Sequence, residues 1–197
     1  MPMSSVFSTP LVTPLLRGAM TLTLRLCGWT IKLDGLPPPP FVVIGAPHTS
    51  NWDFALMLGA LLHARRDARW LGKDSLFRWP FNGLMRWLGG IPVDRSQPHD
   101  MVAVIAETLK LDPQLLLFVA PEGTRKKVDR WRTGFYFIAL EAGVPIVMTT
   151  MDTATRQVKL LGQYRPTGDA DREIREIQRH YRGFAGLNAA NTFELHE

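Results

Sequence analysis

The chain is 197 residues long, with 46% hydrophobic and 21% charged residues, and carries 23 Lys and Arg against 18 Asp and Glu. That length fits one domain with its own core, and the composition excludes a disordered chain. With Cys27 as its one cysteine, the chain has no internal disulfide. The net charge of +5 favours anionic partners, namely phosphates, acidic lipid headgroups or nucleic acid, without choosing among them.

The N-terminal segment, residues 1–30, predicts an amphipathic helix. Apolar residues recur at helical spacing over 11–28, and Arg17, Thr21 and Arg25 form a narrow polar stripe. Such a helix either lies in a membrane interface or packs on the domain with its arginines in solvent, and the pattern leaves both open. We expect no secretory signal, because no basic segment opens the chain, and no apolar run long enough to cross a bilayer occurs.

Strands alternate with helices along the rest of the chain. The sequence predicts strands at 29–34, 41–45, 68–72, 91–94, 115–119, 145–150 and 157–161, the last as an antiparallel edge strand. It predicts helices at 51–65, 81–89, 99–111, 131–142 and 169–184. This alternation is typical of a single α/β domain, here over 31–185, in which helices cover a mixed, mostly parallel sheet. A loosely held tail is expected over 186–197.

The most informative polar residues follow the strand at 41–45. His48 comes three residues after the strand, and Asp53 lies five residues further on, across a helix start. Ligands of open α/β sheets bind beyond the carboxyl ends of the strands, where His48 can take a proton while Asp53 orients it. Ser50-x-x-Asp53 is also a helix capping box, which explains the aspartate without chemistry. The residues alone leave both interpretations open.

Charged groups also follow other predicted strands. They are Lys73, Arg95 and the segment Glu122-Gly123-Thr124-Arg125. Arginine presents a planar fork to phosphate, and glycine lets the backbone approach a ligand. With His48 on the same rim, these cations suggest a site that acts on a hydroxyl of a phosphate-bearing molecule. The alternative is a set of surface turns with solvated charges. Serine-hydrolase, P-loop and zinc-protease signatures do not occur in the sequence.

Four segments of the sequence resemble the glycerolipid acyltransferases, a family typified by lysophosphatidic acid acyltransferase. They occur in the family's order between residues 41 and 150 and comprise His48–Asp53, Lys73–Arg95, Pro121–Arg125 and Gly143–Val147. Three positions depart from the family pattern, namely Pro47, Ala120 and Met148. None of the three carries a catalytic or charged group, so they affect the expected acceptor rather than the expected reaction.

The resemblance implies a role for each matched polar residue. His48 and Asp53 would be catalytic. The acceptor's phosphate would be clamped by three cations, Lys73, Arg95 and Arg125. Its glycerol backbone would be held by Glu122 and Gly123, with Thr124 beside them in the substrate-binding set.

The implied reaction is direct transfer of a fatty acyl group from acyl-CoA or acyl carrier protein to a lysophospholipid hydroxyl, converting lysophosphatidic acid to phosphatidic acid. Neither a cofactor nor a metal is expected. The implied setting is an anionic membrane surface, with the protein held peripherally at the cytoplasmic face of the inner membrane. The aromatic-rich stretch 77–88 either lines a groove for the acyl chain or packs in the core.

Three alternatives remain at this stage. The acceptor could be another lysolipid or an amino-acid lipid. The chain could be a non-catalytic lipid-binding protein that kept the fold. The basic run 125–132, which includes Trp131, could bind nucleic acid by stacking and charge. A charge run is usually a solvated face, however, and no nucleic-acid-binding motif accompanies this one, so we expect no nucleic-acid partner.

Overall fold

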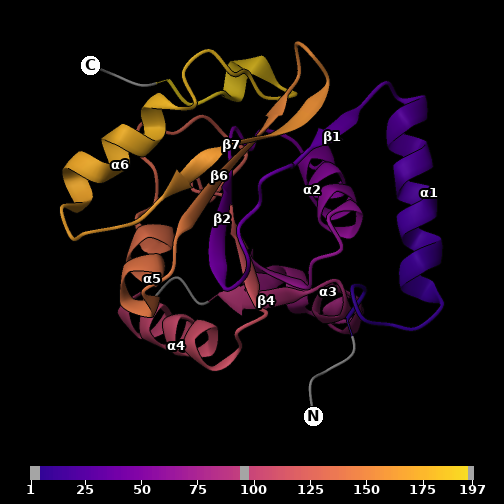
Figure 1. Ribbon diagram of the computed structural model, residues 1–197, viewed down its shortest axis with the longest axis horizontal. Coiled ribbons are helices and arrows are strands. Elements are labelled where there is room, and N and C mark those ends of the chain that lie inside the picture. Colours follow the sequence, from indigo (N-terminus) through magenta and orange to yellow (C-terminus); the bar gives the residue numbers. More distant parts are fainter. Residues whose placement is uncertain (1–4, 94–97, 195–197) are drawn as a thin grey trace.

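The structure, a computed structural model, describes residues 5–93 and 98–194, with side chains left out at 98–100. Within these residues one seven-stranded sheet organises the chain (Figure 1). Its strands are β1 (Thr30–Lys32), β2 (Phe41–Gly45), β3 (Ala68–Lys73), β4 (Gly90–Val93), β5 (Leu116–Val119), β6 (Ile146–Asp152) and β7 (Gln157–Tyr164). The helices are α1 (Val12–Leu26), α2 (Trp52–His63), α3 (Asn82–Trp87), α4 (Pro98–Leu111), α5 (Gly134–Ala142) and α6 (Ala170–Arg179). Two 3-10 turns are η1 (Asp74–Phe77) and η2 (Ala189–Asn191).

The sheet is mixed and mostly parallel, in the order β1-β7-β6-β2-β5-β3-β4. Strands β6, β2, β5, β3 and β4 run parallel, so their carboxyl ends meet at one edge. The α/β fold class predicted from the sequence is confirmed. The antiparallel pairing of β7 with β6 is confirmed too, but its predicted edge position is wrong. The three-residue strand β1 pairs with β7 in parallel and takes the edge instead.

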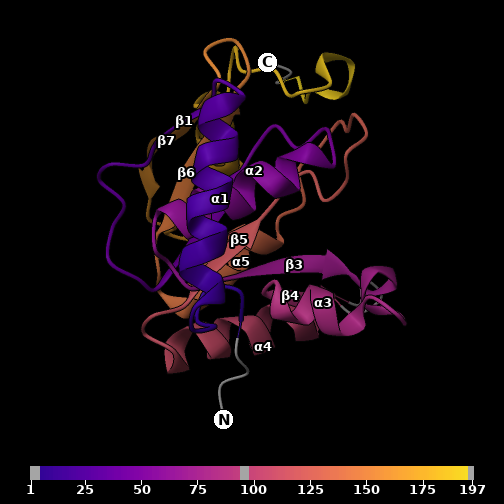
Figure 2. The same cartoon turned by 90° about the vertical axis from the view of Figure 1, so that its right-hand side faces the viewer.

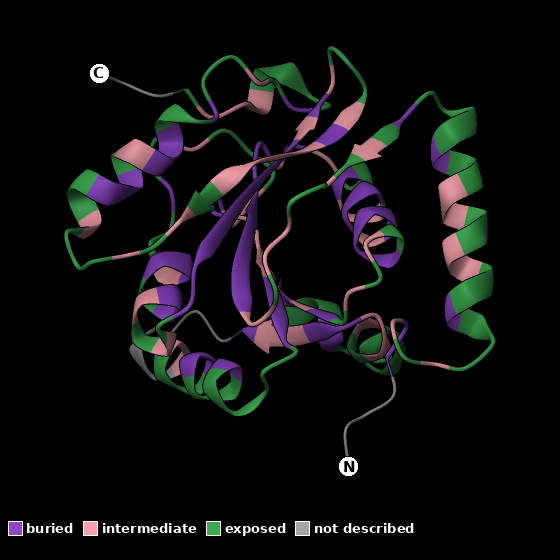
Figure 3. Cartoon of the chain, viewed as in Figure 1, coloured by how far each residue is buried: buried purple, intermediate pink, exposed green. Residues whose placement is uncertain are grey.

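Strand β2 is buried on both faces, which explains its uninterrupted apolar sequence (Figure 3). Val42 and Ile44 face the larger core, built with α4, α5 and α6. Phe41 and Val43 face the opposite core, where α2 supplies Met57 and Leu61. The central strand is therefore fixed from both sides, and the loop that leaves its carboxyl end starts from a rigid position.

Helix α1 forms an outer layer against α2 (Figures 1 and 2). Gly59 of α2 admits Leu24 and Met20, and Arg17 donates from Nε to the Leu62 carbonyl at 2.8 Å. Arg17 thus packs on the domain and does not join a solvent-facing polar stripe. The outward face instead carries large apolar side chains that are mostly exposed, namely Leu11, Leu15, Leu22 and Leu26. No described helix meets the length and apolarity needed to cross a bilayer.

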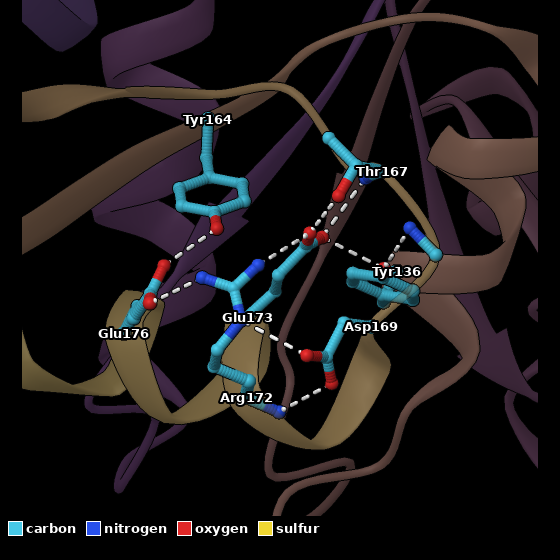
Figure 4. A network of polar contacts seen from close by, with 8 residues as sticks. Tyr136, Tyr164, Thr167, Asp169, Arg172, Glu173 and Glu176 are labelled. Atoms are coloured by element: carbon cyan, nitrogen blue, oxygen red, sulfur yellow. Dashed lines mark hydrogen bonds and ion pairs between the residues drawn. The ribbon is translucent and has the colours of Figure 1, made fainter.

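A buried carboxylate anchors α6 to the rest of the domain (Figure 4). Glu173 is fully buried and accepts hydrogen bonds from the Tyr136 hydroxyl at 2.8 Å and from the Thr167 backbone and hydroxyl. The helix ends at Arg179, five residues earlier than predicted, where i to i−3 hydrogen bonds tighten the chain into turns. These turns bring Tyr181 into the larger core.

Candidate active site

The loop between β2 and α2 holds the predicted histidine and aspartate in contact. Asp53 is 2% exposed, and its Oδ2 accepts the backbone N–H groups of Thr49 at 2.6 Å and Ser50 at 2.8 Å. The same oxygen lies 3.3 Å from Nδ1 of His48, whose side chain is 25% exposed. Asp53 therefore faces the imidazole and also accepts the Ser50 backbone N–H just before α2, which is one half of the predicted capping box.

A second buried carboxylate supports the histidine from the next strand. Glu122, in the turn after β5, is 3% exposed, and its Oε1 accepts the His48 backbone N–H at 3.1 Å. Its Oε2 is buried without a hydrogen-bond partner among the described residues. Burial raises the pKa of Glu122, and the hydrogen bond from His48 partly opposes that rise. The neighbouring Gly123 has φ +65°, a left-handed conformation that glycine adopts without strain.

Tyr181, which belongs to no sequence motif, lies beneath the loop between β2 and α2. The Tyr181 hydroxyl donates to the Ile44 carbonyl in β2 at 3.2 Å, and Thr149 of β6 donates to the same oxygen at 2.9 Å. Burial raises the pKa of Tyr181, and the negative charge of Glu122 adds to that effect. Tyr181 is 137 residues from its partner, and only the fold brings the two together.

The loop between β2 and α2, residues 46–51, carries His48, and we call it the histidine loop. An open pocket of about 350 Å³ lies beside it. Its lining residues are all of polar types, namely Thr49, Ser50, Asn51, Thr124, Arg125, Lys126 and Asn191. We call this the polar pocket. Two of these residues are cationic and none is acidic, so the pocket favours an anionic group. The structure thus brings Thr124 and Arg125 to the histidine loop, as the sequence predicts. Lys126 and Asn191 were not predicted.

The other two predicted cations are not part of this pocket. Lys73 is exposed at the carboxyl end of β3, on the same sheet edge, but β5 separates its strand from β2. Arg95 lies outside the described residues. A clamp that joins Lys73, Arg95 and Arg125 therefore stays a prediction.

Four backbone N–H groups close to His48, which could otherwise stabilise an oxyanion, already have hydrogen-bond acceptors. The N–H groups of His48, Thr49 and Ser50 already donate to carboxylates, and that of Gly123 donates to the Ala120 carbonyl at 3.0 Å. These groups stabilise the loop in the resting structure.

A small apolar cavity of about 30 Å³ lies on the α2 side of the sheet. Its lining includes Gly45, at the end of β2, Met57 and Leu61 of α2, and Leu36. The aromatic stretch 77–88 does not contribute to its lining. Phe77 instead packs in the core, 5.9 Å from Trp70 between ring centroids. Trp79 is 92% exposed.

The basic run 125–132 does not form a stacking surface. Trp131 is buried, with its ring centroid 5.3 Å from Tyr181 and 5.6 Å from Phe193. Lys127 is paired with Glu194 at 3.0 Å. An aromatic ring in the core cannot stack on a base, so the nucleic-acid interpretation loses its main support.

Comparison with known proteins identifies the family of the region that contains this site. The family model described as Acyltransferase matches residues 30–152, which include the histidine loop, the Glu122 turn and β6. The chain belongs to the Acyltransferase family. Its fold is similar to that of the crystal structure of the 1-acyl-sn-glycerophosphate (LPA) acyltransferase PlsC from Thermotoga maritima. The TM-score is 0.57 at 19% identity, over 89% of this chain and 82% of that one.

Two similar proteins have the same name. The 1-acyl-sn-glycerol-3-phosphate acyltransferase of Escherichia coli (strain K12) is 30% identical over 122 residues, or 58% of this chain and 48% of that protein. The protein of the same name from Haemophilus influenzae is 28% identical over 120 residues, or 57% of this chain and 48% of its own. The matched region thus spans about half the length of these relatives.

Proposed function

We propose that this protein transfers an acyl group from a thioester to the free hydroxyl of a lysophospholipid, with lysophosphatidic acid as the acceptor. The observation that carries the proposal is the His48–Asp53 contact of 3.3 Å at the open sheet edge, next to a pocket that holds Arg125. A base beside a cationic pocket suits an acceptor that carries a hydroxyl and a phosphate. The names of the 30%-identical relatives favour the same acceptor.

The proposed chemistry uses the two nitrogens of His48 differently. Nδ1 faces Asp53, so Nε2 is left to accept the proton of the acceptor hydroxyl. The hydroxyl oxygen then forms a bond to the thioester carbonyl carbon, giving a tetrahedral oxyanion. When this intermediate collapses, the C–S bond breaks and the imidazolium returns its proton to the leaving thiolate. Asp53 stabilises the imidazolium in between.

Charged residues around the loop take two roles in this proposal. Arg125 and Lys126 hold the acceptor's phosphate in the polar pocket, and Lys73 and Arg95 are further candidates for that contact. Glu122, which the family resemblance assigned to the acceptor's glycerol backbone, is instead proposed as a positioning residue, because its carboxylate is buried and accepts the His48 backbone N–H.

The acyl chain is proposed to enter the apolar cavity next to Gly45, from acyl-CoA or acyl carrier protein. A volume of about 30 Å³ is roughly that of one water molecule in the liquid, so the cavity must widen to take a chain. Met57 lines it, and the flexible thioether side chain can move at low cost.

We also propose that the protein acts peripherally on an anionic bilayer, at the cytoplasmic face of the inner membrane. The exposed apolar face of α1, with Leu15 and Leu22, supports this placement. A second set of exposed apolar side chains, including Trp79 and Phe81, follows β3 near the sheet edge that carries His48. Aromatic side chains favour the headgroup boundary of a bilayer.

Mass spectrometry of the products tests the proposal. The protein is incubated with mixed lysolipids and mixed acyl thioesters, beside H48A. We expect the wild type to make phosphatidic acid and H48A to make less than about a thousandth as much, with a similar thermal midpoint. Product formation by H48A at the wild-type rate would contradict the proposal. Acylation of a different lysolipid alone would replace the proposed acceptor.

A further inference from the structure

One wall of the polar pocket comes from outside the matched family region. Asn191 lines the pocket, whereas the other six lining residues lie within 30–152. Residues 186–194, which we call the C-terminal segment, were predicted to be loosely held. In the structure they make specific contacts with the loop that carries His48.

The C-terminal segment is fixed to the histidine loop at two points. The Asn188 backbone N–H donates to Thr49 Oγ1 at 3.0 Å. Gly186 packs so closely on Thr49 that an added Cβ would overlap its side chain, so a residue without a side chain is required there. Thr49 itself donates its backbone N–H to Asp53, and one residue therefore links the segment to the candidate catalytic pair.

Further contacts close the segment on itself and on the core. The Gly186 backbone N–H donates to Thr192 Oγ1 at 3.1 Å, on either side of the turn η2 that carries Asn191. Phe193 packs on Trp131 with 5.6 Å between ring centroids. The position of Asn191 is therefore set by contacts before and after it.

We propose that Asn191 is a specificity-determining residue that donates a hydrogen bond to an oxygen of the acceptor's phosphate-bearing headgroup. The inference rests on the proposed function. The pocket lining supplies Arg125 and Lys126 as charges, and it also includes Asn191, whose side-chain amide carries two neutral N–H donors. A donor in this wall favours a headgroup rich in acceptor oxygens, as a phosphomonoester is, over one whose phosphate is masked by a substituent.

The test is steady-state kinetics of N191A and N191D with lysophosphatidic acid and with lysophosphatidylcholine. We expect N191A to raise the KM for lysophosphatidic acid about tenfold, with kcat and the KM for acyl-CoA within about twofold of the wild type. N191D keeps the size of the side chain but adds a negative charge. It should lower the preference for lysophosphatidic acid over lysophosphatidylcholine by more than N191A does.

N188A is the matched control, because Asn188 is exposed in the same segment and takes part through its backbone: its N–H donates to Thr49 and its carbonyl accepts from the Asn191 N–H. We expect N188A to behave as the wild type, and thermal midpoints are compared for all variants. Unchanged acceptor KM and preference in both Asn191 variants of an active enzyme would overturn the inference. Equal losses in N188A, or equal losses for both acceptors, would also overturn it, because they indicate a structural role. A wild type that transfers no acyl group overturns the proposed function itself.

Discussion

The substitution D53N isolates the charge of Asp53 while keeping its shape. Asparagine still offers an oxygen to the backbone N–H groups of Thr49 and Ser50, so the loop should persist. What is lost is the attraction between the carboxylate and the imidazolium that forms when His48 takes a proton. At 3.3 Å and an effective dielectric constant of about 20, that attraction is about 5 kcal/mol.

An energy of about 5 kcal/mol corresponds to a factor of roughly 10³ to 10⁴ in rate. Because a quarter of the His48 side chain is exposed, water screens part of this attraction, and we expect kcat to fall about 10²- to 10³-fold. Two charge-assisted hydrogen bonds become neutral, which should lower the free energy of unfolding by about 1–2 kcal/mol. Free thiol released from acyl-CoA measures kcat, and calorimetry measures stability.

The double variant H48A/D53N tests whether Asp53 acts through His48 or independently of it. If Asp53 acts through the imidazole, D53N should change the residual activity of H48A by less than about threefold. Retention of more than a third of the wild-type kcat in D53N would refute the reasoning. So would a further hundredfold loss on adding D53N to H48A.

Three other predictions concern stability and membrane contact. The hydrogen bond from Lys159, at 2.5 Å, with help from Thr155, lowers the pKa of Asp152 to about 2 from 3.8. Asp152 should therefore stabilise the fold by about 2 kcal/mol above pH 4 and lose that contribution as the pH falls through 2. Denaturant unfolding of the wild type and D152N across this pH range measures the contribution. Equal free energies of unfolding for the two proteins at pH 7 would contradict the prediction. Burial raises the pKa of Glu122, so the native state holds this proton more tightly than the unfolded chain, and stability relative to E122Q should fall as the pH rises above 4.5. A flat difference between the two thermal midpoints from pH 4 to 8 would argue against that sign. Replacing the exposed Leu15 and Leu22 by glutamate should reduce sedimentation with anionic vesicles at least fivefold. L24A is the control, because it destabilises the packing of α1 and keeps the exposed outer face. Unchanged sedimentation of the glutamate variant would place the membrane contact elsewhere.

Sequence patterns predicted what depends on neighbours along the chain. The apolar runs at 41–45 and 115–119 became adjacent strands of the sheet centre, because strands buried on both faces need apolar side chains throughout. The spacing of His48 and Asp53 predicted their contact, because one helical turn returns the carboxylate to the preceding loop.

Contacts between segments far apart in the chain could not be predicted from the sequence. Helical periodicity placed Arg17 in a narrow polar stripe facing away from the domain, but it could not tell which side of α1 packs on α2, where Arg17 donates to the Leu62 carbonyl. Nothing in the residues around Glu122 indicates that its carboxylate reaches the backbone of His48, 74 residues away. Tyr181 and Asn191 reach the site only because α6 ends early and the chain turns back over the sheet edge.

The central claim is that His48 removes the acceptor's proton, so that thioester cleavage depends on both the imidazole and the lysolipid. Free-thiol release from acyl-CoA, measured with and without lysophosphatidic acid for the wild type and H48A, tests it most directly. The account predicts release that requires lysophosphatidic acid in the wild type and is absent in H48A under both conditions. Lysolipid-dependent release that persists in a folded H48A would contradict it.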